Sequence, residues 1–523
     1  MTLQQNPWQT LGLCFVLGSA LFGCRKADPR LPALPQDEQI QVYFNQLQAR
    51  GVDYDEPYRG VMRPGDNLEQ VLLDGINEAQ TTIDIAVQEL NLPLVAEALA
   101  KKSGEGVAIR IMVENSYRRP WVEIEQTELF EFDEREQGKY QEFVALADED
   151  KDGFLSDEEK EKYDAIAILE KAGIPILDDT ADGSKGSGLM HHKFMVIDSK
   201  KVITGSANWT LSGIHGDFGN LETRGNVNHI LVMDGEAIAV AFTEEFEEMW
   251  TGRKFGVQKK QDIPQFFNLG NNQITLQFSP FSSAQPWENT SNGLIAQTLA
   301  QATQSINLAL FVFAEQRIAN TLEKELGEGT KIQALIDSSF AFREYSDGLD
   351  MLGINLKEKC DPFNRPWQNP ITSVGTAKLP QGDKLHHKFA VIDSRTVITG
   401  SHNWSASANN QNDETLLIIQ NPQVAAHFEQ EFTRLYGDAY VGIPPFIAEK
   451  QQPIPANCTQ ASTTGIVNIN TASAAELETL PGIGEAIAQR IIKGRPYKNL
   501  QDLDRVSGIG EKKIQAIEGR VTW

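Results

Sequence analysis

The chain has 523 residues, 41% of them hydrophobic, which suits a mostly soluble, globular protein of two to four domains with a sizeable core. Its formal net charge is −25, from 47 basic and 72 acidic residues. A chain this acidic cannot attract nucleic acid through its overall field, so any contact with DNA must come from a local module.

The N-terminus is typical of an export signal. Residues 11–22 form an apolar run that is short for a membrane span, and Leu21-Phe22-Gly23-Cys24 closes it. This end resembles a bacterial lipoprotein box with Cys24 as the lipidated residue; an uncleaved anchor is the alternative. We therefore predict an exported, extracytoplasmic protein, either membrane-anchored through Cys24 or periplasmic or secreted. Residues 1–24 are the predicted signal, and residues 25–50 a tether.

The chain repeats itself at an offset of 195 residues. The segment 190–198 (MHHKFMVID) matches 385–393 (LHHKFAVID), and 202–209 (VITGSANW) matches 397–404 (VITGSHNW). Matching at this density is not chance. Two similar halves are therefore predicted, at residues 55–252 and 274–440, joined by a linker at 253–273.

Strand and helix patterns recur around these motifs. Apolar runs at 83–90 and 107–113 parallel those at 306–313 and 330–336, and apolar helical stretches lie between them. A helical pattern, F-x-x-E-F, follows each HxK motif at 242–250 and 428–436. Alternating strands and helices predict an α/β fold with two pseudo-twofold-related domains, each a mixed sheet flanked by helices.

The spacing H-x-K predicts a phosphate site. On a strand, side chains two apart share a face, so His191 lies beside Lys193 and His386 beside Lys388. If the two faces meet, two cations and two groups that titrate near neutrality surround one anion. One imidazole can then attack phosphorus while the other protonates the leaving oxygen, with no metal in the chemical step. His192 and His387 fall on the opposite face and are predicted to be packing residues.

Two copies of HxKx4D followed by GSxN resemble the phospholipase D superfamily, over roughly residues 55–440. The resemblance implies a phosphodiesterase that works through a phosphohistidine, with His191 as nucleophile and His386 as acid/base. The implied catalytic set, one group from each half, is His191, Lys193, Asp198 and Asn208 with His386, Lys388, Asp393, Asn403 and Glu414.

Within that set the residues are expected to play different parts. Ser206 and Ser401 are expected to support the phosphate pocket, whereas Asp198 and Asp393 are expected to hold the motif loops rather than to react. Glu414 resembles the family acid that orients a histidine. Asn228 stands at the matching place in the first half, which favours different roles for the two histidines.

The first half carries 28 extra residues, which we attribute to an insertion at about 137–171, where an EF-hand-like loop at 148–159 lies between segments that can be helical. A twelve-residue calcium loop requires oxygen ligands at positions 1, 3, 5, 7, 9 and 12 and a glycine at position 6, here Gly153. The predicted ligands are Asp148, Asp150, Asp152, Phe154 through its carbonyl, Ser156 and Glu159. Calcium is expected as a structural ion; a solvated acidic loop is the alternative.

Residues 441–464 are predicted to be a linker, and residues 465–523 a small all-α domain. Two Gly-Ile-Gly turns, Gly482-Ile483-Gly484 and Gly508-Ile509-Gly510, lie between apolar-periodic helices. They resemble tandem helix-hairpin-helix motifs of the kind found in competence DNA receptors. Glycines let the backbone approach phosphate, and free amides at a helix N-terminus receive it, so sequence-independent DNA binding is predicted. A protein-interaction hairpin is the alternative.

The catalytic motifs alone do not separate nucleases from lipid enzymes. The C-terminal module favours a non-specific DNA endonuclease. Phospholipase D or phosphatidyl transferase activity on phospholipid is the alternative, and a non-enzymatic DNA receptor is a third possibility.

Overall fold

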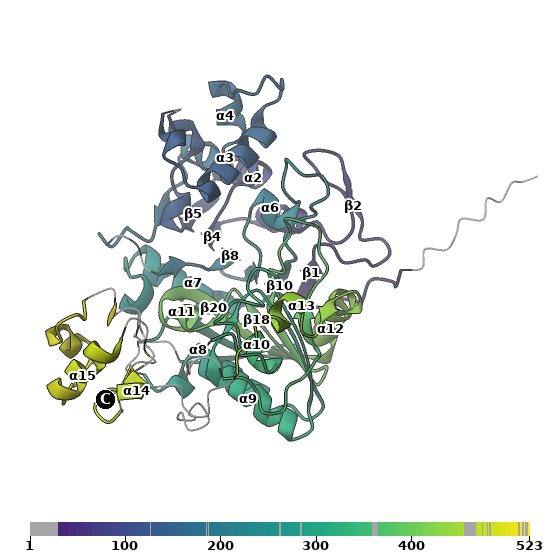
Figure 1. The fold of residues 1–523 in the computed structure, drawn as a ribbon. Coiled ribbons are helices and arrows are strands. Elements are labelled where there is room, and N and C mark those ends of the chain that lie inside the picture. The colour runs from purple at the N-terminus through teal and green to yellow at the C-terminus, as the bar shows by residue number, and fades with distance from the viewer. Residues whose placement is uncertain are drawn as a thin grey trace, which may run out of the picture.

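A computed structural model gives the arrangement of the chain (Figure 1). It describes residues 30–453 and 467–523 apart from short gaps at 126, 185, 187, 261–262, 283–284, 358–364, 473, 478–479, 481–482, 511–512, 515–516 and 518–520. Cys24 and Gly482 lie outside the described residues.

The first half is a seven-stranded mixed sheet covered on its outer face by helices. The HxK strand β8 lies in its middle, antiparallel to both β4 and β9, while β4 and β5 are parallel. In spatial order the strands are β1 (Ile40–Phe44), β10 (His229–Asp234), β9 (Lys201–Gly205), β8 (Lys193–Ile197), β4 (Thr82–Val87), β5 (Ala108–Val113) and β6 (Ile176–Asp178). The outer helices are α1 (Leu68–Glu78), α2 (Pro93–Gly104) and α5 (Ala165–Lys171).

The second half repeats this order within a ten-stranded sheet. Nine of its strands lie in the order β11 (Gln265–Leu269), β12 (Asn272–Ser279), β20 (Asn412–Gln420), β18 (Thr396–Gly400), β17 (Lys388–Ile392), β13 (Ser305–Leu310), β15 (Lys331–Ile336), β16 (Val374–Thr376) and β21 (Tyr440–Val441). The tenth, β7 (Leu189–Met190), comes from the first half and pairs with β20. Helices α8 (Ser291–Leu299), α9 (Gln316–Gly327) and α10 (Asp347–Met351) cover its outer face. The predicted α/β class and the paired mixed sheets are confirmed.

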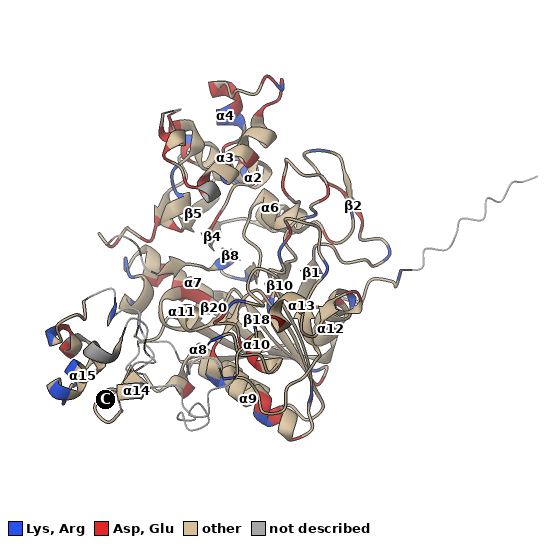
Figure 2. Cartoon of the chain, viewed as in Figure 1, with Lys and Arg blue, Asp and Glu red and all other residues tan. Residues whose placement is uncertain are grey.

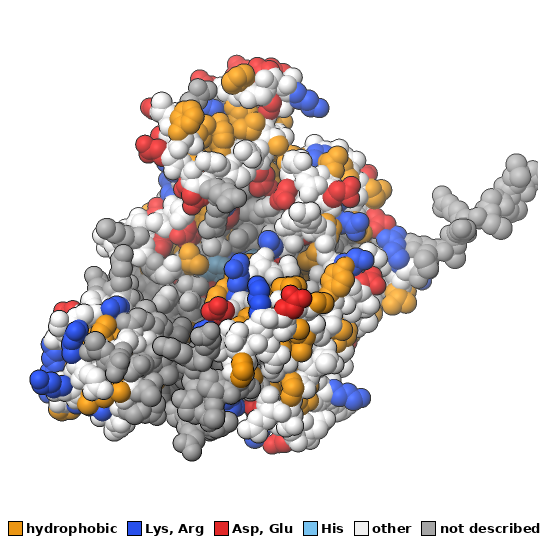
Figure 3. Space-filling view, viewed as in Figure 1, with side chains coloured by type: hydrophobic (Ala, Val, Ile, Leu, Met, Phe, Trp, Pro, Cys, Tyr) orange, Lys and Arg blue, Asp and Glu red, His pale blue; other side chains and the backbone are white. Residues whose placement is uncertain are grey.

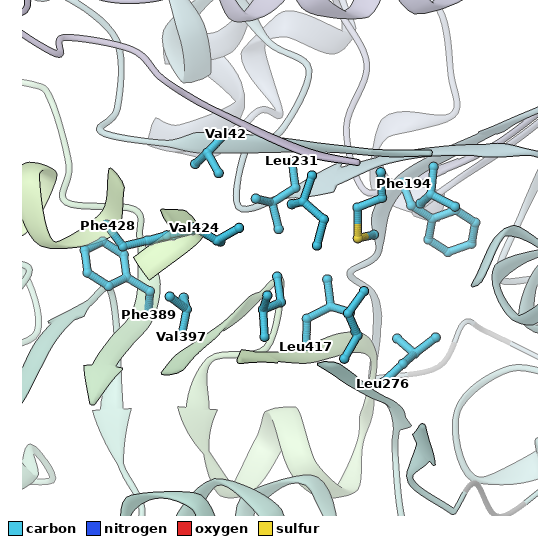
Figure 4. Packing of buried hydrophobic residues seen from close by; sticks show 14 of the residues in the cluster. Val42, Phe194, Leu231, Leu276, Phe389, Val397, Leu417, Val424 and Phe428 are labelled. Atoms are coloured by element: carbon cyan, nitrogen blue, oxygen red, sulfur yellow. The ribbon is translucent and has the colours of Figure 1, made fainter. Parts of the chain in front are cut away.

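The inner faces of the two sheets pack against each other and form one core (Figure 4). Phe194 and Leu231 of the first sheet meet Val397 and Leu417 of the second, and all four are almost completely buried. Helices α7 (Glu236–Trp250) and α12 (Pro422–Gly437) carry the two F-x-x-E-F patterns into this core. The halves are therefore joined by a continuous apolar interface, which fixes the two HxK strands relative to each other.

The predicted insertion forms a helical unit at one end of the first half (Figure 1). Helix α3 (Glu134–Ala147) leads into the EF-hand-like loop, and α4 (Asp157–Tyr163) leaves it. Both helices begin with a capping box. The side chain of the first residue of the box accepts the backbone N–H of the Glu three residues on, and that Glu side chain accepts the backbone N–H of the first residue. Figure 2 marks the Asp and Glu positions along these helices in red.

The C-terminal residues have a core of their own, which includes Leu477, Ile491 and Leu503. Helices α14 (Ala474–Leu477) and α15 (Glu485–Gly494) belong to it, and the domain is closed by a parallel pair of short strands, β22 (Val467–Asn468) and β23 (Val521–Thr522). The all-α prediction missed this pair because two-residue strands leave no periodic pattern. None of the helices in the described part of the chain has both the length and the apolar character needed to span a bilayer.

Three predicted connecting segments are partly folded. The tether prediction is wrong for β1, because Ile40, Val42 and Phe44 are buried at the edge of the first sheet. The predicted linker 253–273 contains the strand β11, and the predicted linker 441–464 begins with the end of β21 and helix α13 (Pro445–Ala448). Each element is too short or too polar to stand out from its flanks by periodicity.

Candidate active site

The segment before each HxK strand pairs with the other half. Strand β7 (Leu189–Met190) runs parallel to the start of β20, and the His191 N–H donates to the carbonyl of Asp413 at 3.0 Å. The mirror contact joins the His386 N–H to the carbonyl of Val227, also at 3.0 Å. The strands β8 and β17 begin only at the lysines, so the prediction that the histidines lie within these strands is wrong. Each histidine instead lies at the seam between the halves.

Each histidine is held by a side chain from the opposite half. The Nδ1–H of His191 donates to Oε2 of Glu414 at 2.7 Å, and the Nδ1–H of His386 donates to Oδ1 of Asn228 at 2.9 Å. Both imidazoles are buried, with relative exposures of 6% and 9%. Among the described residues no side-chain hydrogen bond to Nε2 of either ring is found, so each Nε2 can meet a ligand. One pair has a carboxylate acceptor and the other an amide, so the two histidines are chemically unequal.

The serines of the two GSxN motifs hydrogen-bond to the residues that hold the histidines. Ser206 Oγ donates to Asn228 Oδ1 at 2.8 Å, and Ser401 Oγ donates to Glu414 Oε2 at 2.7 Å. Both hydroxyls are fully buried. The serines thus orient the groups that hold the histidines, one step further from a phosphate than the sequence suggested.

The two lysines lie close enough to the histidines to affect their titration. Lys193 Nζ donates to the carbonyl of His191 at 2.9 Å, and Lys388 Nζ to that of His386 at 2.6 Å. Burial lowers the pKa of Lys193 to about 7, against the opposing effect of Glu414. Burial and then Lys193 lower the pKa of Lys388 well below its usual value. Glu414 acts on both lysines, and Glu89 and Asp337 act on one each, yet burial outweighs them, so a bound anion would stabilise both ammonium groups.

The histidine pKa values are shifted in the same sense. Burial and the two lysines hold the pKa of both His191 and His386 well below 6.5. Burial raises the pKa of Glu414, which His402 and Lys193 oppose. A bound phosphodiester would reverse the effect of the lysines and let one imidazole keep a proton. Figure 3 shows histidine at the bottom of a hollow, with Lys and Arg side chains beside it.

Asn208 and Asn403 remain short of partners. The Oδ1 atom of each is buried and has no hydrogen bond within the described part of the chain. Buried amides of this kind are normally satisfied, so an unpaired pair at matching positions points to a polar ligand.

The motif aspartates lie at the far ends of β8 and β17. Asp198 has a φ of 51°, and its carboxylate accepts N–H groups of Gln80, Thr81 and Thr82. Asp393 does the same for residues 303–305, with a φ of 50°. These contacts stabilise a turn against the neighbouring strand, and neither carboxylate bonds a motif histidine or lysine.

Sequence reasoning missed several neighbours of the site. Phe311 packs its ring 4.7 Å from that of His386 and 4.9 Å from Lys388 Nζ, whereas the matching residue of the first half, Gln88, accepts from Lys193 Nζ at 3.4 Å. The 223-residue offset of the early strands aligns these two positions and could have drawn attention to them.

The second histidine of each motif belongs to a buried polar network. His192 Nε2 lies 2.9 Å from Glu245 of α7, and His387 Nε2 lies 3.2 Å from Glu431 of α12. Lys259, from the predicted linker, bridges Glu245 and Asp413. The histidines predicted to be packing residues therefore anchor the two F-x-x-E-F helices by hydrogen bonds.

The predicted calcium ligands come together in part. Carboxylate oxygens of Asp148, Asp150 and Asp152 lie within 4.8 Å of one another, and Gly153 has the φ of +85° that the sharp turn requires. Glu159 caps α4, and its Oε2 accepts from the Ser156 hydroxyl at 2.7 Å. The Phe154 side chain is 70% exposed. The donor set is all oxygen, which fits a hard cation.

The hairpin turns of the C-terminal domain bury their isoleucines. Ile483 and Ile509 have relative exposures of 3% and 5%. Gly484 precedes α15, and Gly508 has a φ of +96°. The first turn thus lies at the start of α15, on which Figure 2 marks Lys and Arg positions in blue.

Family models match both parts of the chain. A model described as "Cardiolipin synthase, PLD-like domain" matches residues 72–250 and 295–436, and one described as "Helix-hairpin-helix motif" matches residues 462–522. Together these matches cover the two HxK halves and the C-terminal domain.

Curated relatives match shorter stretches. The mitochondrial cardiolipin hydrolase of Chlamydomonas reinhardtii is 24% identical over 26% of this chain and 54% of its own length. The mitochondrial cardiolipin hydrolase of Canis lupus familiaris is 37% identical over 19% of this chain and 33% of its own length. Phospholipase D of Rickettsia felis is 28% identical over 26% of this chain and 60% of its own length. The chain thus spans about a third to three fifths of the length of these relatives.

The solved structures that match this chain have low sequence identity to it. Phosphatidylserine synthase of Haemophilus influenzae is 11% identical with a TM-score of 0.49, over 82% of this chain and 93% of that one. Nuc of Salmonella typhimurium, a phospholipase D family member, is 19% identical with a TM-score of 0.27, over 33% and 100%.

Proposed function

Since the chain belongs to the phospholipase D-like family, we propose that it is a phosphodiesterase, and specifically a non-specific DNA endonuclease. The observation that carries the proposal is the convergence of two buried imidazole–ammonium pairs at the seam between the halves. One phosphodiester between them would neutralise the lysines and meet both Nε2 atoms.

The reaction proceeds by double displacement. Nε2 of His191 bonds to phosphorus as the bond to the leaving oxygen breaks, and His386 gives its Nε2 proton to that oxygen. His386 then takes a proton from water, whose oxygen attacks phosphorus and breaks the P–N bond. Acid–base assistance contributes roughly 10²- to 10⁴-fold, so the lysines and asparagines must stabilise the charged transition state further.

The unequal partners support these roles. An imidazole that becomes phosphorylated gains positive charge, which the Glu414 carboxylate stabilises at 2.7 Å. An imidazolium held by the neutral amide of Asn228 is a stronger acid, which suits protonation of a leaving group.

The helix-hairpin-helix match supports DNA rather than lipid as the substrate. The turn that ends at Gly484 precedes α15, and N–H groups at the start of a helix suit phosphate. To test this, purified protein is incubated with plasmid, single-stranded DNA or phosphatidylcholine vesicles, each with EDTA or calcium. DNA cleavage that persists in EDTA supports the proposal. Release of choline with intact DNA would favour the phospholipase alternative.

Two accompanying proposals concern the EF-hand-like loop and the N-terminal segment. The EF-hand-like loop binds Ca²⁺ as a structural ion, outside the chemical step. Residues 1–24 direct export, with lipid attached at Cys24, so a Cys24→Ser variant should lose incorporation of labelled palmitate and partition into the aqueous phase of a detergent extract.

A further inference from the structure

A cavity of about 400 Å³ lies between the insertion and the first sheet. We name it the insertion pocket. Its floor is the chain after β4 together with Leu211 of α6 (Leu211–Ile214), and its walls are the loop after β5, α3 and the start of α5. Its volume is in the range of small-molecule sites. The lining residues used below are Glu89, Tyr117, Trp121, Phe132, Lys139 and Glu142.

The pocket begins one residue beyond the catalytic groups. Gln88 accepts from Lys193, and the next residue, Glu89, lines the pocket. Asn208 is followed by Trp209, whose N–H donates to the carbonyl of Glu89 at 3.0 Å. A group attached to a phosphate at the two lysines would therefore have the pocket as its neighbour, since consecutive residues are about 3.8 Å apart.

Flat apolar surface dominates the walls. Trp121 is stacked on Phe143, with ring centroids 5.8 Å apart and an interplanar angle of 17°, and Phe132 lies edge-on to it. Tyr117 lies under Lys139, whose Nζ is 4.0 Å from the ring centroid. Half-buried aromatic rings that face a cavity suit a planar ligand.

One polar group in this pocket has an unmet hydrogen bond. Glu142 Oε1 is buried and has no partner in the described part of the chain. Burial, with Asp217 and Glu89, raises the pKa of Glu142 to about 8, so at neutral pH it offers an O–H donor beside an acceptor. The other acids are occupied: Glu89 pairs with Lys139, and Asp133 and Glu136 form the capping box of α3.

These features select one class of ligand. An acyl chain would leave Glu142 buried and unsatisfied, and an organic cation would need a free carboxylate. A nucleobase has two flat faces and donors and acceptors along its edge. We propose that the insertion pocket binds a nucleobase next to the scissile phosphodiester, an inference that rests on the proposed nuclease function. A base must leave its stack to enter, so the substrate is single-stranded or frayed DNA.

The test compares a single-stranded oligonucleotide with copies that carry one abasic site at successive positions. Loss of one stacked base should lower kcat/KM at the adjacent bond by roughly 5- to 150-fold. A Trp121→Leu variant should lose that difference, because the wall no longer stacks. Phe130→Leu is the matched control, since Phe130 lies in the same loop region but is 89% exposed and outside the pocket. An equal abasic effect in wild type and Trp121→Leu would overturn the proposal.

Two further measurements separate the possible failures. If the far-UV circular dichroism of Trp121→Leu shows that this variant is unfolded, the same comparison is made with Tyr117→Leu, which changes another wall of the pocket. Glu142→Gln stays neutral, so it should keep its KM above pH 8, where the wild-type KM rises. If the protein cleaves DNA but an abasic site has no effect, the pocket assignment is wrong and the nuclease proposal stands. If DNA stays intact, choline is released, and Trp121→Leu slows that release, then the pocket binds a lipid headgroup and the nuclease proposal is wrong.

Discussion

His191 and Glu414 are 223 residues apart and come from different halves, yet the imidazole Nδ1 lies 2.7 Å from the carboxylate Oε2. The equivalent pair, His386 and Asn228, crosses the seam in the opposite direction at 2.9 Å. Neither half therefore contains a complete site. The interface core does more than stabilise the fold, because a shift between the sheets would part each histidine from its partner.

Glu414→Gln should lower kcat by about 10²-fold or more, within the range ascribed to acid–base groups. The amide keeps the shape but no longer stabilises positive charge on His191. Asn228→Asp is the matched change at the other histidine. It should raise the pKa of His386, which acts as the acid, and so move the alkaline-side limb of the kcat profile to higher pH. Measured pH–rate profiles that are identical for all three proteins would contradict the assignment of unequal roles.

A trapped phosphohistidine intermediate can show which of the two histidines is the nucleophile. With a p-nitrophenyl diester, whose leaving group needs no acid, His386→Asn should form the phosphohistidine but hydrolyse it slowly, because the base for water is missing. His191→Asn should form none. Mass spectrometry of the quenched protein locates the adduct, and an adduct on His386 in the His191→Asn variant would reverse the assignment.

The sequence predicted the parts of this site that lie in contiguous motifs. The paired HxK and GSxN segments stand out because they repeat, and the Glu414–Asn228 difference is visible once the halves are aligned. Lys259 could not be found in this way, since its role depends on contacts across the fold, and for Phe311 the offset indicates only the position that matches Gln88, not the ring contact with His386. The short strand β1 was missed because five alternating residues in a polar, proline-bearing segment resemble a tether, and the insertion pocket exists only between elements far apart in the chain.

Anion binding should weaken as pH rises. Burial lowers the pKa of Lys193 to about 7, so its ammonium is present below that pH and lost above it. The inhibition constant of dimethyl phosphate, a monoanion throughout, should therefore rise by up to about tenfold per pH unit between pH 7 and 9. Lys193→Arg keeps its charge and should flatten the profile. A wild-type constant that does not change over this range would show that Lys193 stays protonated.

Calcium should stabilise the insertion. At a concentration 100 times the dissociation constant, a single-site ligand adds about 2.7 kcal/mol to the state that binds it. Isothermal titration calorimetry should show one site, lost in Asp150→Asn and kept in Glu158→Gln, an exposed acid of α4 outside the predicted ligand set. DNA cleavage should continue in EDTA at 25 °C. Calorimetry without a binding heat would leave the loop as a solvated acidic turn.

Lys259 should stabilise the buried network of Glu245 and Asp413 that lies behind His191. Its Nζ pairs with Glu245 and lies 2.8 Å from Asp413 Oδ1, and all three side chains are buried. Burial opposes ionisation of Glu245, but Lys259 and His192 outweigh it and hold the pKa of Glu245 at about 2. Lys259→Met would leave two buried carboxylates without their cation, at a cost of about 3–5 kcal/mol in the free energy of unfolding. Urea denaturation measures this, with the exposed neighbour Lys260→Met as control. The Asp413 carbonyl also accepts the His191 N–H, so the kcat of Lys259→Met should fall together with its stability. Equal unfolding midpoints for Lys259→Met and Lys260→Met would show that the Lys259 network does not stabilise the interface between the halves.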